Sequence, residues 1–588
     1  MPTPHKKQSN LGTCRIQGIG ATRGVEIGRA HIRQPHTLEI SQKKVPANEV
    51  PAQLQRLHCA IEAARQEIHA LQDRLRGALD WTAGEFLELH AMLIDDPELL
   101  QNLDALIQEN CYSAEYAVKV QHQRLGTAFQ KMQDPYLKSR IDDLDHVISR
   151  IFAFLQERPP EKKGRSGDIL ISQNVSPSEL TELQSHGIRA IVTANGSSLS
   201  HTAILARSMH LPLVVAAGES IFQKIKEDDT LIIDGNNGLV LVNPSSKEIE
   251  HYRACLREQA KEQRALGRLR HKVTRTADHV DILLRANAES ENDIKQSYAI
   301  GADGVGLYRT EFFFLARNTL PTEEEQFQAY RKALLEMRGR LVTIRTLDLG
   351  ADKADRIGLA ASNEANPALG IRGIRLLLKH SHVAKAHLRA IIRASEYGPL
   401  RILIPMIGGR EDAIRAKQMI RRISAQLLQE GHAIAQTIPI GAMIEVPSAA
   451  LTIDTFIDQL DFLSIGTNDL TQYVLAVDRT NEDVSDSYSP LHPAVLRLLH
   501  TVIQTANQAE KPVCLCGEMA GNPYYIPLLL ALGLTDFSLH PGMLLEVRNT
   551  VRLHHYSYLR SHTARLLQAR DRRSIQNWLK TYSCPPKL

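Results

Sequence analysis

The sequence predicts a multidomain α/β protein: a small α/β domain interrupted by a helical bundle, then a helical connector and a C-terminal (β/α)8 barrel. A chain of 588 residues is too long to fold around one hydrophobic core, so several domains are expected. Between residues 46 and 157 glycine becomes rare and apolar residues recur at helical spacing. Beyond residue 276, strand-like and helical segments alternate, which is the pattern of a barrel of parallel strands.

The composition is that of an ordinary globular protein. Hydrophobic residues make up 43% and charged residues 23%, and the 70 basic residues nearly balance the 66 acidic ones. This balance lacks the clustered positive charge typical of nucleic-acid binding. No apolar run reaches the roughly 18 residues of a membrane helix, and the polar N-terminus lacks the apolar core of a signal peptide. The seven scattered cysteines form no disulfide pattern, so we expect a cytoplasmic protein with reduced thiols and no membrane partner.

The small α/β domain is predicted from two segments, residues 1–45 and 158–245. Glycines between short apolar pairs in Arg15–Ile32 indicate one or two strands with tight turns. In the second segment, short apolar runs alternate with helical stretches and indicate buried strands. These runs are Asp168–Ser172, Ala190–Val192, Leu213–Val215 and Leu231–Ile233.

A helical bundle, residues 46–157, interrupts this domain, and a helical linker, residues 246–275, follows it. The bundle is predicted from apolar residues that share one helix face. These are Leu54, Leu57, Ile61, Ala64, Ile68, Leu71 and Leu75. The helix Ser246–Lys272 has only a thin apolar stripe, which suits a connector between domains better than a core helix.

The barrel is predicted over residues 276–588, where helical stretches separate eight strand-like segments. These segments are Val280–Ala286, Gly304–Tyr308, Leu341–Thr346, Arg401–Met406, Pro439–Glu445, Asp461–Gly466, Pro512–Cys516 and Asp536–Leu539.

Polar residues gather at the carboxyl ends of these strands, the face that carries the active site in such barrels. They are Asn287, Arg309, Glu311, Arg345, Asp348, Glu445, Asn468, Asp469, Cys516 and Glu518, with Arg372 and Arg479 nearby. Arginine forks match phosphate oxygens, and carboxylates together with water and substrate oxygens satisfy Mg²⁺. The set therefore predicts a magnesium-dependent phosphate site, and simple pairing of arginines with acids at the barrel rim is the alternative.

Cys514 and Cys516 lie two residues apart on one predicted strand, so both side chains face the same side. Both could be small core residues, because free cysteine is commonly buried. The spacing does not support a zinc site, which would need further ligands nearby. Only Cys516 lies at the end of the strand, where a thiol can exchange a proton with a substrate.

His201 is predicted to lie in the first turn of a helix for which Ser200 is a good N-cap. That turn presents free N–H groups and the positive end of the helix dipole, which would stabilise a phosphoryl group on the imidazole. The chain has 24 histidines, so a surface or capping histidine is the alternative.

Several long motifs, in the expected order, resemble those of the phosphoenolpyruvate-utilising enzymes. They are Ser200–Arg207, Gly304–Phe312 followed by Leu320–Phe327, Phe462–Arg479, and Cys516–Gly521. The resemblance runs from about Ile19 to Asn549 and is closest to the Enzyme I family of the bacterial phosphotransferase system, which are phosphoenolpyruvate–protein phosphotransferases.

The resemblance implies a swivelling phosphohistidine domain and a defined reaction. The phosphoryl group of phosphoenolpyruvate would pass to His201 and then to a histidine of the carrier protein HPr, releasing pyruvate in the first step of sugar uptake. Cys516 matches the proton donor, and Glu445 and Asp469 match the Mg²⁺ ligands. The residues that match the substrate-binding set are Arg309, Arg345, Asn468, Arg479, Arg372 and Lys353.

The resemblance also implies that the helical bundle docks the carrier and that the barrel forms a homodimer. Glu88–Leu93 and Asp134–Lys138 fit the family pattern in the bundle. One departure lies beside the predicted nucleophile. The family usually reads Gly-Gly-x-Thr-Ser-His, whereas this chain reads Gly196-Ser-Ser-Leu-Ser-His201.

Three alternatives remain open. A pyruvate phosphate dikinase or phosphoenolpyruvate synthase shares the histidine domain and the barrel but also needs a large nucleotide-binding domain, for which the 200 residues before His201 are too few. A nitrogen-type Enzyme I normally carries an N-terminal sensor domain that is not found in this sequence. A non-catalytic scaffold would bind a carrier without transferring phosphate, and the retained charged residues of the barrel speak against it.

Overall fold

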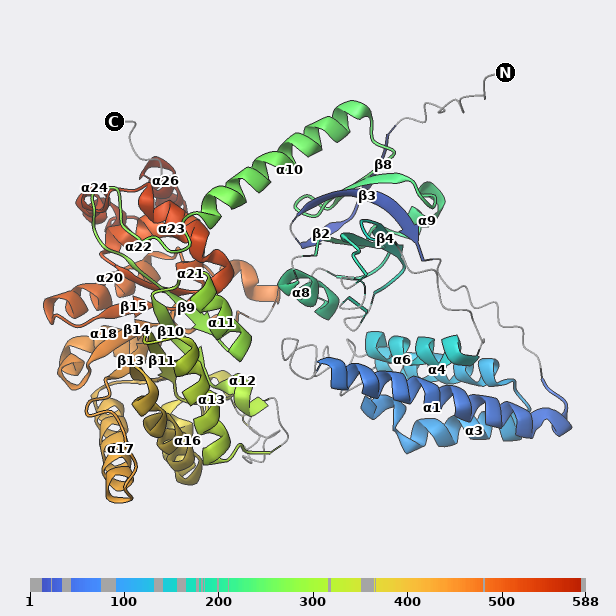
Figure 1. The fold of residues 1–588 in the computed structure, drawn as a ribbon, viewed down its shortest axis with the longest axis horizontal. Coiled ribbons are helices and arrows are strands. Elements are labelled where there is room, and N and C mark those ends of the chain that lie inside the picture. The colour runs from blue at the N-terminus through green and yellow to red at the C-terminus, as the bar shows by residue number, and fades with distance from the viewer. Residues whose placement is uncertain are drawn as a thin grey trace. The chain divides into compact units, whose positions relative to one another are not determined.

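The computed structural model of the chain consists of two compact units, Met1–Ala260 and Lys261–Leu588 (Figure 1). The structure describes residues 13–22, 24–33, 44–75, 91–131, 141–155, 165–175, 179–180, 183, 186–197, 200–209, 211–315, 319–350, 364, 366–479 and 482–582. The mixture of a sheet domain, a helical cluster and a closed barrel confirms the predicted multidomain α/β class.

The first unit contains an eight-stranded sheet in the order β1-β8-β7-β3-β4-β5-β6-β2. Its strands are β1 (Cys14–Gln17), β2 (Ile19–Thr22), β3 (Val25–Ile32), β4 (Ile169–Ser172), β5 (Ala190–Thr193), β6 (Leu213–Val215), β7 (Thr230–Asp234) and β8 (Leu239–Val242). The long β3 pairs antiparallel with β7 and parallel with β4, and so joins the two halves of the sheet. The segment 15–32 thus contributes three strands, where the sequence predicts one or two, and β8 is a strand that the sequence did not predict.

The middle of this sheet has a hydrophobic core on each face, and neighbouring residues of a strand point to opposite cores. In β4, Ile169 and Ile171 belong to one hydrophobic core and Leu170 belongs to the other. The second core also contains Ala203 and Leu205 of the helix α8 (His201–Ser208). The sheet therefore holds the short helix that begins with the predicted nucleophile.

A cluster of four helices shares a separate core: α1 (Val50–Leu75), α3 (Pro97–Asn110), α4 (Ala114–Lys131) and α6 (Ile141–Leu155) (Figure 1). Leu57, Ile61, Ala64 and Ile68 of the predicted stripe are buried in this core. Residues 88–90 and 134–138 of the proposed carrier-docking pattern lie outside the described residues.

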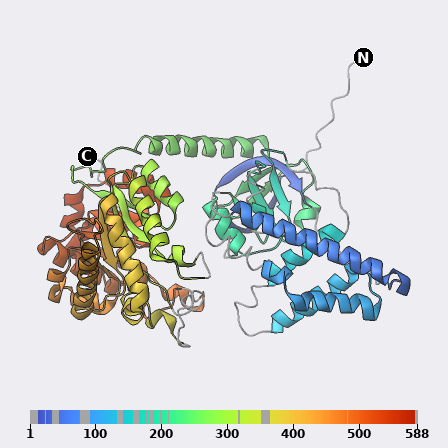
Figure 2. The ribbon, with the colours of Figure 1, turned by 60° about the horizontal axis from the view of Figure 1, so that its bottom comes forward.

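The connector α10 (Ser246–Gly267) is one uninterrupted helix (Figure 2). Its predicted thin stripe packs on the sheet of the first unit, where Ile249, Tyr252 and Leu256 contact a small core with Val25 and Ile232. The helix ends at Gly267 rather than at the predicted Lys272. Across the ranges that the structure covers, none of the helices combines the length and the apolar character that crossing a bilayer requires.

The second unit is a closed barrel of parallel strands in the order β10-β11-β12-β13-β14-β15-β16-β9. Its strands are β9 (Leu283–Ala288), β10 (Gly304–Arg309), β11 (Leu341–Arg345), β12 (Leu400–Ile404), β13 (Ile440–Ile444), β14 (Phe462–Ile465), β15 (Val513–Leu515) and β16 (Asp536–Leu539). All eight predicted strands are present, which confirms the (β/α)8 barrel.

Helices form the outer layer of this barrel (Figure 1). The longer ones are α11 (Glu291–Ala299), α13 (Glu323–Glu336), α16 (Ser381–Ala394), α17 (Arg410–Gln429) and α20 (Pro493–Gln508). α11 and α13 begin with reciprocal capping boxes, Ser290 with Asp293 and Thr322 with Glu325. These caps satisfy helix N–H groups and fix where each helix starts.

Candidate active site at the barrel mouth

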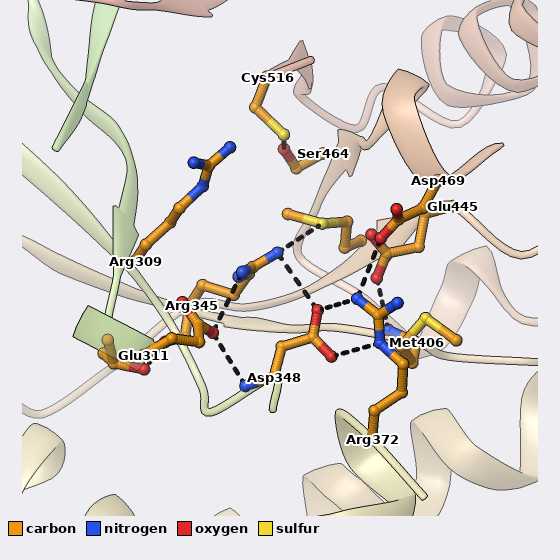
Figure 3. Close-up of polar contacts among 12 residues, drawn as sticks. Arg309, Glu311, Arg345, Asp348, Arg372, Met406, Glu445, Ser464, Asp469 and Cys516 are labelled. Carbon is orange, nitrogen blue, oxygen red and sulfur yellow. Dashed lines mark hydrogen bonds and ion pairs between the residues drawn. The ribbon is translucent and has the colours of Figure 1, made fainter. Parts of the chain in front are cut away.

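Charged side chains converge at the carboxyl ends of the barrel strands. Arg309 ends β10, Arg345 ends β11 and Glu445 follows β13, while Asp469 lies in the first turn of α19 (Thr467–Leu475). Figure 3 shows these four side chains directed toward one region. The structure therefore brings these four residues together, and the roles that the sequence predicts for them stay predictions.

Arg345 is the centre of this cluster, with only 12% of its side chain exposed. Its Nη2 lies 3.1 Å from Oε1 of Glu311, at the start of α12 (Glu311–Leu315), and its Nη1 lies 3.5 Å from Oδ2 of Asp348. Burial opposes the charge of the guanidinium, but Glu311, Asp348 and Glu445 together raise the pKa of Arg345 above its ordinary value. A permanently charged fork thus faces the barrel mouth.

Arg372 bridges two carboxylates. Its Nε and Nη2 donate to the two oxygens of Asp348 over 2.9 and 2.7 Å, and Nη2 also donates to Oδ2 of Asp469 over 3.1 Å. Its Nη1 donates to the hydroxyl of Tyr473 over 3.2 Å. The bidentate geometry is that of a strong ion pair. The side chain of Asp348 is only 1% exposed.

Glu445 is buried, with 1% of the residue exposed, and one oxygen accepts the backbone N–H of Met406 over 2.7 Å. Burial, and then the negative charges of Asp348 and Asp469, raise the pKa of Glu445 to about 8. The positive charges of Arg345 and Arg372 lower this pKa only in part, and a cation bound beside Glu445 would lower it further.

The pair Glu445 and Asp469 fits Mg²⁺ by the chemistry of its donors, because this ion prefers one or two carboxylates and keeps several waters. Within the described residues, no group of three or more His, Cys, Asp or Glu side chains is arranged as a complete protein cage for a metal. Space beside the carboxylate comes from Gly466, since a Cβ there would lie 2.9 Å from Oε2 of Glu445. The site therefore suits an ion that shares its coordination with substrate and water.

The remaining predicted substrate residues lie around this centre. Arg309 forms an ion pair with Glu289, and Nη2 of Arg479 lies 3.5 Å from Oδ1 of Asp469. Asn468 is held by Glu518, whose side chain accepts from Nδ2 over 3.1 Å and whose backbone N–H donates to Oδ1 over 3.0 Å.

Cys516 follows β15, and its thiol faces the same part of the barrel as the arginines (Figure 3). The hydroxyl of Ser464 donates to its sulfur over 3.3 Å, and the thiol lies 3.5 Å from the carbonyl oxygen of Ile465. Burial raises the pKa of Cys516, so the thiol keeps its proton near neutral pH. Cys514 instead lies beside Asp536, which accepts from Arg285 over 3.0 Å. The two cysteine side chains therefore lie in different surroundings.

His201 is the first residue of α8, as the sequence predicts. Ser200 is its N-cap and accepts the backbone N–H of Ala203 over 3.3 Å. The free N–H groups of this turn can receive an anion. Lys353 lies outside the described residues, so its predicted place near the substrate phosphate stays a prediction.

Sequence reasoning missed three contributors to the site. Glu289 forms an ion pair with Arg309, and the hydroxyl of Tyr473 accepts a hydrogen bond from Arg372. The backbone N–H of Met406 donates to Glu445. A charged residue just after strand β9 was a usable signal for Glu289. Met406 acts through its backbone N–H, so its side chain type carries no such signal.

The comparisons with known proteins agree with this geometry. The chain matches the N-terminal domain of PEP-utilising enzymes over residues 17–140, their mobile domain over residues 164–238 and their PEP-binding domain over residues 263–556. Relatives called phosphoenolpyruvate-protein phosphotransferase are similar over nearly their whole length. The protein of Cupriavidus necator is 40% identical over 95% of this chain and 97% of that one, and the protein of Geobacillus stearothermophilus is 37% identical over 91% and 92%.

The relative from Staphylococcus carnosus is 34% identical over 97% of this chain and 99% of that protein. The N-terminal and mobile-domain matches cover the sheet and its helical cluster. The PEP-binding match covers the barrel. These matches, together with the cluster of arginines and carboxylates at the barrel mouth, show that the chain is an enzyme and belongs to the phosphoenolpyruvate-protein phosphotransferases of the PEP-utilising family.

Proposed function

We propose that this enzyme transfers the phosphoryl group of phosphoenolpyruvate to its own His201 and then to a histidine of an HPr-type carrier protein, with release of pyruvate. This would be the first step of a sugar phosphotransferase system. The observation that carries the proposal is the convergence of Arg309, Arg345, Glu445 and Asp469 at the mouth of a barrel that matches the PEP-binding domain.

The substrate is a small trianion, and the arginines are suited to hold it. Among the described residues, the buried Nε of Arg345 has no hydrogen-bond partner, so it is available to a substrate oxygen. Arg309 and Arg479 are more exposed, at 34% and 40% of their side chains, and would close around the phosphoryl and carboxylate groups. Bidentate contacts of this kind fix both the position and the orientation of phosphate oxygens.

Glu445 and Asp469 would hold Mg²⁺, which when bound supplies positive charge to the phosphoryl and enol oxygens. Asn468 directly precedes Asp469 in the first turn of α19, where its amide would orient a substrate oxygen. Burial opposes the charge of Asp348, but Arg345 and Arg372 lower its pKa, and Arg372 also donates to Asp469. These contacts fix the positions of the charges before the substrate binds. Such preorganised charges usually give the largest single contribution to catalysis.

The transfer is an in-line displacement. The neutral imidazole of His201 forms a nitrogen–phosphorus bond while the bond between phosphorus and the enol oxygen breaks, leaving an enolate. The thiol of Cys516 then gives its proton to the methylene carbon of that enolate, which completes pyruvate. His201 and the arginines belong to different units, so the first unit must deliver the imidazole, and we place the hinge in residues 246–275.

The remaining assignments follow the family resemblance and are part of the proposal. The sheet segments, residues 1–45 and 158–245, would carry the phosphohistidine, and residues 46–157 would dock the carrier. Residues 276–588 would bind phosphoenolpyruvate and form a homodimer. The proposed substrate and carrier place the reaction in the cytoplasm.

The test follows pyruvate release from phosphoenolpyruvate by the purified chain with Mg²⁺. The proposal predicts one burst of pyruvate per active site without carrier, and continuous release when an HPr-type protein is added. His201→Ala should abolish the burst of pyruvate. His432→Ala is the matched control for that variant, because His432 is a half-exposed barrel histidine beside Glu430. A chain that binds the carrier and releases no pyruvate would be a scaffold, and labelling by ATP would indicate a dikinase.

A further inference from the structure

One fully buried histidine of the barrel has no part in the proposed chemistry. His387 lies in α16 with 0% of its surface exposed. Its ring packs edge-on against Phe314 of α12 and Tyr330 of α13, with ring centroids 5.5 and 6.0 Å apart. A polar ring in such an apolar place needs hydrogen-bond partners for both nitrogens.

Both partners are present, and they fix the state of the ring. Nδ1 of His387 lies 2.8 Å from Oε1 of Gln326, whose own Nε2 donates to the carbonyl oxygen of Pro321 over 3.0 Å. The amide oxygen of Gln326 therefore faces the ring, and Nδ1 carries the proton. Nε2 is then an acceptor, and it receives the backbone N–H of Leu347 over 3.2 Å.

The ring stays neutral in this position. Burial lowers the pKa of His387 to about 3, because the charged imidazolium would lose its hydration. At any pH near neutrality His387 is thus a fixed hydrogen-bond acceptor rather than a proton carrier.

Leu347 lies in the turn that leaves β11, between Arg345 and Asp348. Three successive N–H groups of this turn are held by three different elements. Thr346 donates to the carbonyl oxygen of Leu403 over 2.9 Å, Leu347 donates to His387, and Asp348 donates to Oε1 of Glu311 over 2.9 Å. A strand, a buried ring and a rim carboxylate together define the path of the backbone.

Among the described residues, His387 is the hydrogen-bond partner of the Leu347 N–H. Leu347 is fully buried, so an N–H without His387 would lose its partner away from water. The turn would then move to recover a partner. Arg345 and Asp348 flank the turn, so both would shift, and Asp348 would take its partner Arg372 with it.

We propose that His387 is a positioning residue of the phosphoryl-transfer site, which fixes the 346–348 turn and thereby the places of Arg345 and Asp348. The inference rests on the proposed function, because it takes Arg345 as a substrate-binding side chain. It adds to that function a residue of the outer helical layer that has no contact with the substrate.

Variants with an amide side chain at position 387 test the role of the Nε2 acceptor apart from the rest of the imidazole ring. In His387→Gln the amide oxygen reaches the place of Nε2 and can accept from Leu347, whereas the shorter side chain of His387→Asn cannot. His387→Leu keeps the bulk and removes the acceptor. Tyr330→Phe is the matched control, because it deletes a hydroxyl 3.3 Å from Nδ1 and leaves the bond to Leu347 intact.

Steady-state kinetics with phosphoenolpyruvate and hydrogen exchange of the Leu347 amide are measured for each variant. We expect kcat/KM to fall about 10- to 100-fold in His387→Asn and His387→Leu, as for a displaced catalytic group. His387→Gln and Tyr330→Phe should stay close to the unmodified chain. Exchange of the Leu347 amide should accelerate in the same two variants that lose activity.

Two outcomes overturn the inference. One is a folded His387→Asn with unchanged kcat/KM, and the other is a folded His387→Gln that is as impaired as His387→Asn. Should His387→Leu fail to fold, the comparison of Gln with Asn still decides. An unmodified chain that releases no pyruvate from phosphoenolpyruvate would instead refute the proposed function, so the two failures are distinguishable.

Discussion

The backbone N–H of Met406 donates to Oε1 of Glu445 over 2.7 Å, from a residue whose φ is 59°. Non-glycine residues rarely adopt this left-handed region, and when they do the surrounding structure holds them there, often at functional sites. Here the support includes Gly373, because a Cβ at that position would lie 2.7 Å from Cβ of Met406. The proposed metal ligand therefore depends on a strained backbone and on a glycine behind it.

Gly373→Ala should disturb this support. The new methyl group meets Met406, and Gly373 itself has a φ of 54°, so we expect a loss of about 1–3 kcal/mol in the free energy of unfolding. The Kd for Mn²⁺, measured by titration calorimetry, should rise because Glu445 moves. Gly409→Ala is the control, since its φ is 166° and a Cβ there meets nothing within 4 Å. A folded Gly373→Ala with unchanged Mn²⁺ affinity would contradict this account of Met406.

Arg372→Met should destabilise the barrel. It leaves the carboxylate of Asp348, 1% exposed, without its bidentate partner, and a buried charge that loses its partner costs about 3–5 kcal/mol. Urea unfolding measures this change, and the double variant Arg372→Met/Asp348→Leu should recover part of it. The control is Arg410→Met, whose exposed pair with Asp458 should give no measurable change. Equal effects of Arg372→Met and Arg410→Met would show that Asp348 is not held as described.

Much of the fold follows from patterns that are local in the sequence. The eight barrel strands were predictable because short apolar runs alternate with helical stretches. For β16, the predicted first and last residues are those of the observed strand. The segment 14–32 was harder, because β1 and β2 have only four residues each and the partners of all three strands lie in distant parts of the chain. The apolar run of β8 was a usable strand signal, but its pairing with β1 and β7 joins distant parts of the chain and cannot be read from these four residues.

The site was predictable only as far as strand ends can be read. Arg309, Arg345, Glu445 and Cys516 each end or follow a strand, and parallel strands bring these positions to one face. The links among them depend on side-chain conformations and long-range packing. The bridge from Arg372 to both Asp348 and Asp469 joins residues 24 and 97 positions apart, which spacing alone does not reveal.

Asp469→Asn should weaken magnesium binding. The amide supplies a neutral oxygen where a carboxylate stood, so we expect the half-saturating Mg²⁺ concentration in the pyruvate assay to rise at least about tenfold. Direct Mn²⁺ titration should show the same shift without substrate. Asp454→Asn, at an exposed position after β13, is the control. A Mg²⁺ titration that Asp469→Asn leaves unchanged would remove this residue from the metal site.

Cys516→Ala should separate the two halves of the reaction. Proton delivery to the enolate should slow by about 10²–10⁴-fold, while phosphorylation of His201 is less affected. Single-turnover experiments compare pyruvate formed with phosphohistidine formed. Cys514→Ala is the control, because that thiol lies beside Asp536 and has no role in the proposed transfer. Equal effects of the two variants, or none from Cys516→Ala, would argue against this proton donor.

The location of the transferred phosphoryl group tests the central claim most directly. The chain is incubated with phosphoenolpyruvate and Mg²⁺, digested under mildly alkaline conditions that preserve phosphohistidine, and analysed by mass spectrometry. We expect one phosphoryl group, on the peptide that contains His201, absent from His201→Ala and retained in His432→Ala. A phosphoryl group on another residue, or one that persists in His201→Ala, would contradict the account.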